Sequence, residues 1–180
     1  MKIGIYGGSF NPIHFGHTGL AQWVVNNTDL DEVWLMVSPN NPLKDTSILA
    51  DEQVRLIEAR KAIANIQSPI AKQIVVSDFE FSLPRPNYTA NTLRELQKQY
   101  PQHDFTLIIG EDNLDIFNKW REYQYILENY RIFVYPRRNI ISQTSQQHED
   151  ILRKANNVKL LADAPYFDIS STELRKNLHN

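Results

Sequence analysis

The 180-residue chain contains no cysteine. Disulfide frameworks, thiolate metal sites and cysteine nucleophiles are therefore excluded. No apolar run approaches the roughly 18 to 20 residues that a membrane-spanning helix needs, and the first residues lack the apolar stretch and cleavage site of a signal peptide. We therefore expect a cytoplasmic protein that has no membrane partner.

The chain also lacks a large excess of charge of either sign. It contains 19 Lys and Arg residues and 21 Asp and Glu residues, which give a net charge of -2. A protein held to a nucleic acid polymer by a broad basic field is therefore disfavoured, and any nucleotide that it binds should be small. With 42% hydrophobic and 22% charged residues, the composition is that of a globular protein. The length predicts one domain over residues 1–180.

Apolar runs of strand length alternate along the chain with segments of helical pattern. The expected strands are 2–6, 32–38, 73–81, 105–109, 131–135 and 158–161, and the expected helices are 17–27, 51–66, 89–100 and 142–156. Most of the strand runs are continuously apolar, as in strands that are covered on both faces of a parallel sheet. The alternation predicts an α/β fold with a doubly wound, mainly parallel sheet, whose ligands bind beyond the carboxyl ends of the strands.

Two of the expected helices have predicted buried faces. In 51–66, Asp51 is a suitable N-cap, and the residues assigned to the buried face are Val54, Ile57, Ala62 and Ile63. In 89–100, Leu93 and Leu96 are assigned to the buried face, and Pro101 follows the end of the helix.

The segment after the first expected strand reads G-G-S-F-N-P-I-H-F-G-H and ends in His14 and His17. It is neither a dinucleotide-binding G-x-G-x-x-G loop nor a P-loop, so a hydride-transferring dehydrogenase loses its main support. A helix start carries unpaired N–H groups and partial positive charge, so two imidazoles beside it favour a seat for phosphate. The alternatives are a turn with incidental histidines and, less favoured, a histidine-only metal site without a nearby acidic ligand.

Near the other end the sequence reads F-D-I-S-S-T-E-L-R. Ser170 and Glu173 have the spacing of a capping box, so Ser170 can cap a helix whose first free amides belong to Ser171 and Thr172. Arg175 then projects from the first turn. Hydroxyls, amides and a guanidinium together favour binding of a polyphosphate, and an ordinary capped helix is the alternative.

These two motifs resemble the signatures of the HxGH nucleotidyltransferase superfamily, whose members transfer a nucleotidyl group and release pyrophosphate. The resemblance implies a Rossmann-like nucleotidyltransferase fold in which the second motif holds the ATP phosphates. Ser9 and Asn11 stand where threonine and aspartate are commoner. The chain ends five residues after Arg175, where many relatives continue, so a C-terminal segment is expected to be missing.

Segments between the two motifs narrow the resemblance. Lys44 follows the second expected strand, a Tyr88-Thr89 pair opens a helix, a Gly110-x-Asp112 segment leaves a buried strand, and Trp120 lies just beyond. Taken alone, the lysine could be a solvated loop residue and the tryptophan a core or interface residue. Together these segments resemble bacterial nicotinate-nucleotide adenylyltransferases from Lys2 to Arg175.

That resemblance implies adenylyl transfer from ATP to nicotinate mononucleotide, giving deamido-NAD and pyrophosphate in NAD biosynthesis, with magnesium accompanying ATP and no protein side chains assigned to the metal. The catalytic residues implied are His14, His17, Lys44 and Arg175. The ATP-binding residues implied are Gly7, Gly8, Ser9, Phe10, Gly110, Asp112, Ile169, Ser170, Ser171 and Thr172. The residues implied for nicotinate mononucleotide are Asn40, Tyr88, Thr89, Trp120 and Arg137.

Several alternatives stay open. Arg137 can be part of a solvated basic turn, and the family's usual Arg-Pro-Gly is Arg137-Arg138-Asn139 here. Phosphopantetheine adenylyltransferases and cytidylyltransferases share the histidine loop. A non-catalytic adenine-nucleotide sensor would also retain both phosphate motifs. A homo-oligomer is compatible with the sequence, and discrimination between nicotinate and nicotinamide depends on where one or two backbone donors lie.

Overall fold

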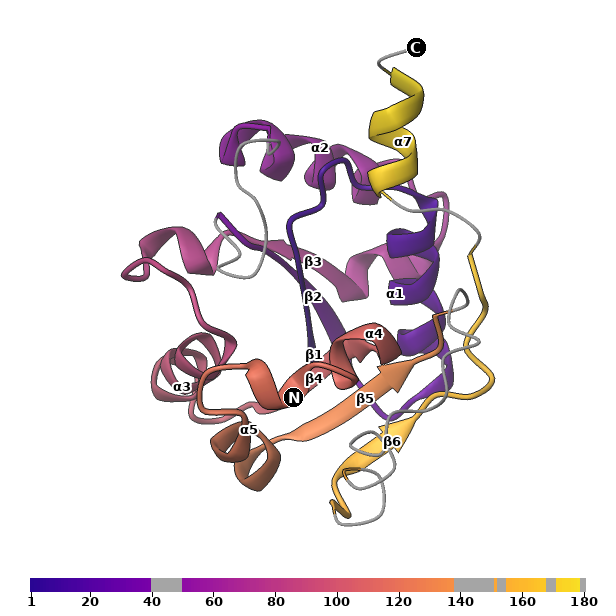
Figure 1. Ribbon diagram of the computed structural model, residues 1–180. Helices are drawn as coiled ribbons and strands as arrows, with labels where there is room; N and C mark the ends of the chain where they lie inside the picture. The colour runs from indigo at the N-terminus through magenta and orange to yellow at the C-terminus, as the bar shows by residue number, and fades with distance from the viewer. Residues whose placement is uncertain (40–49, 138–150, 152–154, 168–170, 179–180) are drawn as a thin grey trace.

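Parallel strands in the order β3-β2-β1-β4-β5-β6 form a single sheet in the computed structural model, which describes residues 1–39, 50–137, 151, 155–167 and 171–178 (Figure 1). The strands are β1 (Lys2–Gly8), β2 (Glu32–Val37), β3 (Ile74–Ser77), β4 (Asp104–Gly110), β5 (Arg131–Tyr135) and β6 (Val158–Leu160). The α-helices are α1 (Phe15–Asn27), α2 (Glu52–Ala64), α3 (Thr89–Gln99), α4 (Glu111–Leu114), α5 (Tyr123–Asn129) and α7 (Ser171–Leu178). The short 3-10 helices are η1 (Pro69–Gln73), η2 (Phe79–Ser82) and η3 (Phe117–Lys119).

Helices cover both faces of the sheet, which confirms the predicted doubly wound α/β fold. Successive strand residues point to opposite faces. In β5, Phe133 packs on the face that α1 and α2 cover, whereas Ile132 and Val134 pack on the face that α3, α4 and α5 cover. Both faces are therefore apolar cores, which explains why the strands are continuously apolar in sequence.

The strand order reverses between β1 and β4. From β1 the chain proceeds outward to β2 and β3, then returns to β4 on the other side of β1 and proceeds outward to β5 and β6. In open sheets of this kind, the crevice at the reversal, beyond the carboxyl ends of the strands, is the ligand site. The loops that follow β1, β2, β4 and β5 all open on this edge.

The expected strand 73–81 is wrong in its second half. Strand β3 ends at Ser77, and residues 79–82 form the 3-10 helix η2. The Ser77 hydroxyl accepts a hydrogen bond from the Phe79 amide at 3.3 Å, and the Phe81 amide donates to the Asp78 carbonyl at 2.9 Å. These local bonds turn the chain, and the apolar alternation of Phe79 and Phe81 therefore reflects packing of a turn.

The predicted buried face of α2 is confirmed at Ile63 and wrong at Val54 and Ile57. Asp51 does cap the helix, accepting from the amides of Gln53 and Val54, but Val54 and Ile57 are 46% and 48% exposed. The buried residues are Arg55, Leu56, Ala59 and Ile63. Arg55 lies on the buried face because its guanidinium donates to backbone carbonyl oxygens there. A pattern of hydrophobic residues does not reveal such hydrogen bonds. The predicted face of α3 is confirmed, since Leu93 and Leu96 are fully buried.

The expected helix 142–156 lies largely outside the described residues. Among the residues that are described, no helix is long and apolar enough to cross a membrane. The cytoplasmic location stays a prediction.

Candidate active site

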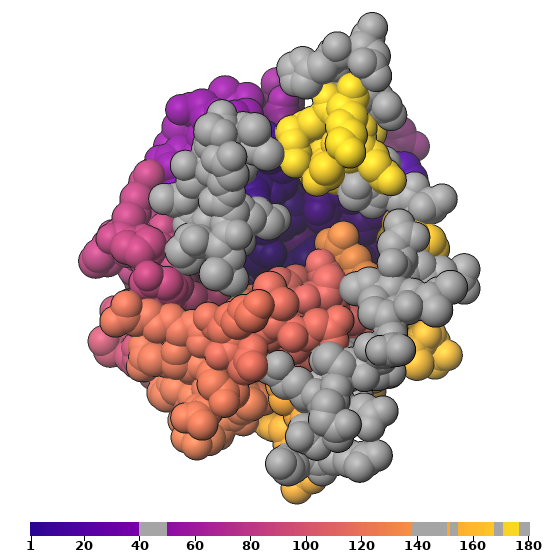
Figure 2. Space-filling model, viewed as in Figure 1, coloured from indigo at the N-terminus to yellow at the C-terminus, as the bar shows by residue number. Residues whose placement is uncertain are grey.

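A cavity of about 830 Å³ opens at the carboxyl ends of the central strands. Figure 2 shows the hollow, with the amino-terminal segment at its floor and α7 at its rim. This volume lies within the range of small-molecule sites. The described residues predicted for the site all line it: Gly7, Gly8, Ser9, Phe10, His14, His17, Tyr88, Thr89, Gly110, Asp112, Trp120, Arg137, Ser171, Thr172 and Arg175. Asn40, Lys44, Ile169 and Ser170 lie outside the described residues.

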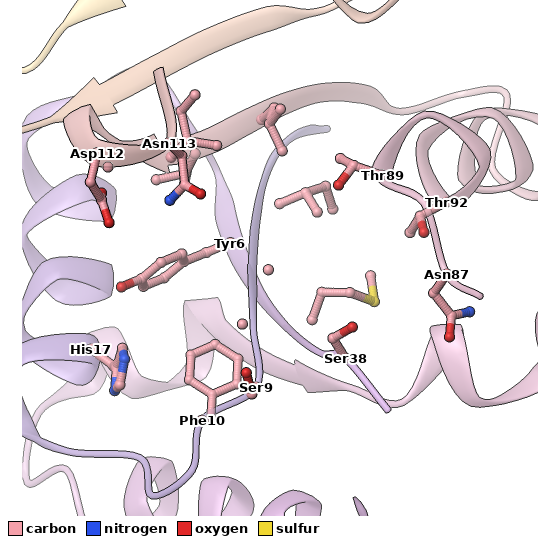
Figure 3. A pocket seen from close by; sticks show the side chains of 18 of the residues that line it. Tyr6, Ser9, Phe10, His17, Ser38, Asn87, Thr89, Thr92, Asp112 and Asn113 are labelled. Atoms are coloured by element: carbon pink, nitrogen blue, oxygen red, sulfur yellow. The ribbon is translucent and has the colours of Figure 1, made fainter. Parts of the chain in front are cut away.

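Figure 3 shows two groups of labelled side chains, with Ser9 and Phe10 between them. Tyr6, His17, Asp112 and Asn113 lie together at one end of the view, and Ser38, Asn87, Thr89 and Thr92 lie together at the other. We call these ends the histidine side and the α3 side of the cavity. Trp120 belongs to the α3 side, because its neighbour Arg121 places its guanidinium 5.0 Å from the centroid of the Tyr88 ring.

The two histidines lie at the start of α1, as the motif predicts. His14 is the N-cap residue, and its backbone N–H donates to Nδ1 of His17 at 3.2 Å. Because Nδ1 of His17 accepts this bond, the neutral ring carries its proton on Nε2. The two rings stack with centroids 3.7 Å apart. The pair therefore behaves as one unit whose geometry is held by the helix start.

His14 is neutral in the ligand-free protein. Burial, together with the positive charge of Arg137, lowers the pKa of its imidazole from 6.5 to about 4. Its Nδ1 atom is buried and makes no hydrogen bond with any residue that the structure describes. An unsatisfied ring nitrogen in a cavity is unfavourable unless a ligand completes it, and an anion there would favour the protonated ring.

Arg55 of α2 holds the loop between β1 and the histidines through hydrogen bonds to backbone carbonyl oxygens. The Arg55 side chain is 1% exposed. Its guanidinium donates to the carbonyl oxygens of Ser9 at 2.6 Å, Ser38 at 2.8 Å, Pro39 at 3.1 Å and Ala50 at 3.0 Å. One side chain thus ties the loop after β1 to the loop after β2.

Phe10 forms the floor of the histidine side. Its φ of 45° lies in the left-handed region, which costs a bulky residue roughly 1 to 3 kcal/mol and is retained where the surroundings demand it. Its ring is 2% exposed and packs edge-on against the rings of Tyr6 and His17, with centroids 5.9 and 5.0 Å away. The strained backbone therefore places an aromatic support behind His17.

The start of α7 docks on this same loop. The Ser171 hydroxyl donates to the Pro12 carbonyl at 2.9 Å, and the Arg175 guanidinium donates to the Asn11 carbonyl. Arg175 also donates to the Thr172 hydroxyl at 3.2 Å. The two motifs from opposite ends of the chain are therefore in direct contact at one wall of the cavity.

A polar cluster forms the wall between these motifs and β4; it joins the predicted residues Asp112 and Arg137 to two tyrosines, Tyr6 and Tyr135, that the sequence analysis missed. Tyr6 and Tyr135 have hydroxyls 3.4 Å apart, and Arg137 donates to the Tyr135 hydroxyl at 3.3 Å. The Arg137 Nε atom lies 3.7 Å from Asp112 Oδ1. Burial raises the pKa of Tyr6 well above its ordinary value, so its hydroxyl stays protonated. No sequence signal marks the tyrosines, because they read as strand residues.

Gly110 leaves room for the Asp112 carboxylate in this wall. A Cβ at this position would meet the Asp112 carboxylate and would lie 3.2 Å from the Tyr135 ring. The glycine therefore lets the carboxylate of Asp112 fold back over the end of β4.

The α3 side is formed by the helix start and by η3. Tyr88 is the N-cap residue of α3, and its side chain makes no capping bond. The Thr89 and Ala90 amides, like those of any first helical turn, have no intrahelical acceptor. Trp120 packs on Phe117 with ring centroids 5.1 Å apart while it lines the cavity. Trp120 therefore both packs against the core and lines the cavity.

The described lining of the cavity carries more positive than negative charge. Its Lys and Arg residues are Lys119, Arg121, Arg137 and Arg175, whereas Glu80 and Asp112 are its only acidic residues within the described part of the chain. Because the whole chain is slightly negative, this excess is local. A low-dielectric cleft with an excess of cations concentrates anions.

A Rossmann-like sheet whose cavity joins a histidine loop to a second helix start is the arrangement expected of a nucleotidyltransferase, and the comparison with known proteins agrees. Residues 5–177 match the cytidylyltransferase-like family, and the chain belongs to this family. It is 43% identical over 182 residues to the probable nicotinate-nucleotide adenylyltransferase of Flavobacterium psychrophilum, covering 100% of this chain and 88% of that protein. It is 46% identical over 175 residues to the protein of the same name in Cytophaga hutchinsonii, covering 97% and 84% of the two chains.

A solved structure shares the fold. The nicotinic acid mononucleotide adenylyltransferase of Plasmodium falciparum, complexed with NaAD, superposes with a TM-score of 0.79 at 22% identity, covering 97% of this chain and 82% of that chain. These findings confirm the family resemblance that the motifs indicate and the predicted fold.

Proposed function

We propose that this protein transfers the adenylyl group of ATP to nicotinate mononucleotide and releases pyrophosphate. The observation that carries the proposal is the shared cavity, in which the histidine pair and the start of α7 meet at one wall while the α3 side offers a second compartment. Relatives more than 40% identical over the full chain carry the corresponding name. Two nucleotide substrates need two such compartments that join at the reacting phosphorus.

The reaction needs no general base. A phosphate oxygen of nicotinate mononucleotide, already anionic, attacks the α-phosphorus of ATP in line; the new P–O bond forms as the bond to the β-phosphate oxygen breaks, and pyrophosphate leaves with that electron pair. The protein therefore acts by aligning the two phosphates and by stabilising charge in the transition state. Preorganised donors supply much of that stabilisation.

The histidine side fits the ATP phosphates. The proton of the neutral His17 ring lies on Nε2, because Nδ1 accepts from the backbone, and Nε2–H would donate to a phosphate oxygen. His14 offers a second imidazole whose protonation would be favoured by the incoming anion. Arg175, together with the first amides and hydroxyls of α7, would hold the β- and γ-phosphates. Lys44 keeps its predicted role beside them.

In this proposal, close contact between the backbone after β1 and ATP completes the ATP site. Gly7, Gly8, Ser9 and Phe10 would pass beneath the triphosphate, and Gly110 with Asp112 would border the nucleoside. Ile169 and Ser170 keep their predicted place at the start of α7.

The α3 side fits nicotinate mononucleotide. The Thr89 amide, at a helix start with partial positive charge, would receive the nicotinate carboxylate. Trp120 would stack on the pyridine ring, and Tyr88 would border it. Arg137, which reaches the histidine side, would contact the mononucleotide phosphate, and Asn40 keeps its predicted contact with the same substrate.

Magnesium fits as a companion of ATP. Within the described residues no three His, Asp or Glu side chains gather into a metal site, and the cavity offers Asp112 as a single carboxylate on the histidine side. This donor set suits Mg²⁺, which binds through substrate phosphates, waters and one or two carboxylates. When bound, the ion would neutralise charge on the triphosphate.

The test is pyrophosphate release from ATP with nicotinate mononucleotide, with phosphopantetheine, with nicotinamide mononucleotide and without an acceptor. We expect rapid release with nicotinate mononucleotide alone. Faster release with phosphopantetheine would favour the rival transferase, and ATP binding without release for any acceptor would favour a nucleotide sensor.

A further inference from the structure

A pair of buried side chains on the α3 side has hydrogen-bond capacity that the proposed mechanism does not use. Glu80 of η2 and Asn87 are 7% and 6% exposed, and both line the cavity. Oε2 of Glu80 and Oδ1 of Asn87 are buried and make no hydrogen bond to the residues that the structure describes. Two unsatisfied acceptors in one cavity wall are costly unless a donor from the ligand reaches them.

The remaining atoms of the two side chains are fixed. The Thr92 hydroxyl donates to Oε1 of Glu80 at 2.7 Å, and Nδ2 of Asn87 donates to the Glu80 carbonyl oxygen at 3.1 Å. Both side chains are thus anchored by hydrogen bonds, and Oε2 of Glu80 and Oδ1 of Asn87 are left without a partner among the described residues. Asn87 and Thr92 lie beside Thr89 and Ser38 on the α3 side (Figure 3).

No cation among the described residues pairs with Glu80. Burial raises the pKa of its carboxyl, and hydrogen bonds from Thr92 and Ser38 oppose this change; no charged group in the described part of the chain contributes. A ligand hydroxyl would therefore be the natural partner of this carboxyl, because it donates without bringing a further negative charge.

The chemistry of the substrate identifies the donor. Nicotinate mononucleotide with an ionised phosphate and carboxylate has hydrogen-bond donors only on its ribose, the 2′- and 3′-hydroxyls. We infer that Glu80 and Asn87 form a ribose subsite, in which they accept a hydrogen bond from a hydroxyl of the acceptor mononucleotide. This inference rests on the proposed function and adds to it a specificity determinant between the seats of the carboxylate and the phosphate.

The experiment compares nicotinate mononucleotide with its 2′-deoxy and 3′-deoxy analogues in the wild-type protein. Loss of a hydrogen bond to a buried acceptor that is then left unsatisfied should lower kcat/KM by roughly 10- to 100-fold for at least one analogue. If both analogues react as well as the ribonucleotide, the inference is wrong and adenylyl transfer stands. If the ribonucleotide itself is not adenylylated, the proposed function fails first.

Variants then locate the subsite. For each protein, we compare kcat/KM for the ribonucleotide with kcat/KM for the sensitive analogue. In Glu80→Gln and in Asn87→Ala, this ratio should fall to within roughly threefold of unity, because the Glu80 carboxyl or the Asn87 amide is gone. The corresponding ratio for ATP and 2′-deoxy-ATP should not change. A merely structural role would lower all rates together and leave both ratios as in the wild type, which would overturn the inference.

Glu95→Gln is the matched control. Glu95 lies on the same helix as Thr92 but faces outward, where it pairs with Lys98 at 2.6 Å. The same loss of one charge there should leave the discrimination between ribose and deoxyribose unchanged. An equal drop in the ratio for this variant would show that net charge, not the subsite, is responsible.

Discussion

The two sides of the cavity are built in different ways. On the histidine side, the two ends of the chain meet through main-chain acceptors, with Ser171 donating to Pro12 and Arg175 to Asn11. On the α3 side, η2 and the loop before α3 contribute two buried acceptor atoms, Oε2 of Glu80 and Oδ1 of Asn87, that have no hydrogen-bond partner among the described residues. Under the proposed function, the histidine side would hold the phosphates of ATP, whereas the α3 side would distinguish the acceptor nucleotide through the Thr89 amide and buried side chains. Chemistry and specificity would then occupy separate walls of the cavity.

The largest effect is expected on the histidine side. His17→Ala removes a preorganised donor whose tautomer is set by the His14 backbone, so kcat should fall by roughly 100-fold or more while the protein stays folded. Steady-state kinetics, with thermal unfolding as the check on folding, measures this. An unchanged kcat in a folded variant would remove His17 from the mechanism.

The next effect concerns the residue that joins the two sides. Arg55→Met leaves the carbonyls of Ser9 and Ser38 without their donor and should lower the free energy of unfolding by about 2 to 3 kcal/mol. Denaturant unfolding measures the change, and the KM for both substrates should rise.

Arg60→Met is the matched control for this prediction. Arg60 lies on the same helix, but its side chain is 52% exposed and pairs with Asp78. This substitution should cost less than about 1 kcal/mol. Equal losses for the two variants would mean that the buried guanidinium does not organise the loops.

On the α3 side, Trp120→Ala should raise the KM for nicotinate mononucleotide by about tenfold and leave the KM for ATP nearly unchanged, because stacking contributes on the order of 1 kcal/mol. Initial-rate measurements with each substrate varied in turn test this. Equal losses for both substrates would indicate that Trp120 only packs on Phe117.

The smallest effect concerns pH. Because the pKa of His14 falls from 6.5 to about 4 on folding, the unfolded chain binds more protons between these values, and stability should therefore fall as the pH is lowered through this window. The ring is only partly buried, so the loss should be about 1 kcal/mol. Denaturant unfolding of the ligand-free protein at pH 7 and pH 4 measures it.

His14→Gln provides the comparison, since this side chain does not titrate. The variant should lose that part of the pH dependence and keep the rest. A wild-type and a variant curve of identical slope would contradict the lowered pKa of His14.

Much of the fold was predictable, because continuous apolar runs and their alternation with helical segments are local properties. Asp51 as a cap and Leu93 with Leu96 as a buried face follow from spacing alone, and the structure has them. The failures share a cause. Val54 and Ile57 are exposed because Arg55 occupies the buried face, and the strand expected through Phe81 ends at Ser77 because side-chain and backbone bonds turn the chain there.

The site was predictable where its residues are adjacent in sequence. The two histidines and the S-S-T-x-x-R run form recognisable motifs because a helix start needs its donors within one turn. Arg55, Glu80, Tyr6 and Tyr135 belong to no such run, and each resembles an ordinary helix, turn or strand residue. Their contribution depends on which distant carbonyl or hydroxyl they reach.

Local patterning in the chain was thus sufficient to establish the alternation of strands and helices, the family and the two phosphate motifs, since spacing along one helix or loop is a property of covalent neighbours. Three features arise only when the sheet brings remote segments together: the contact of Arg175 with Asn11, the bonds of the Arg55 guanidinium to both loops, and the buried acceptors of Glu80 and Asn87 without a partner among the described residues. Hydrogen bonds depend on distance and angle in space, and no one-dimensional pattern contains either.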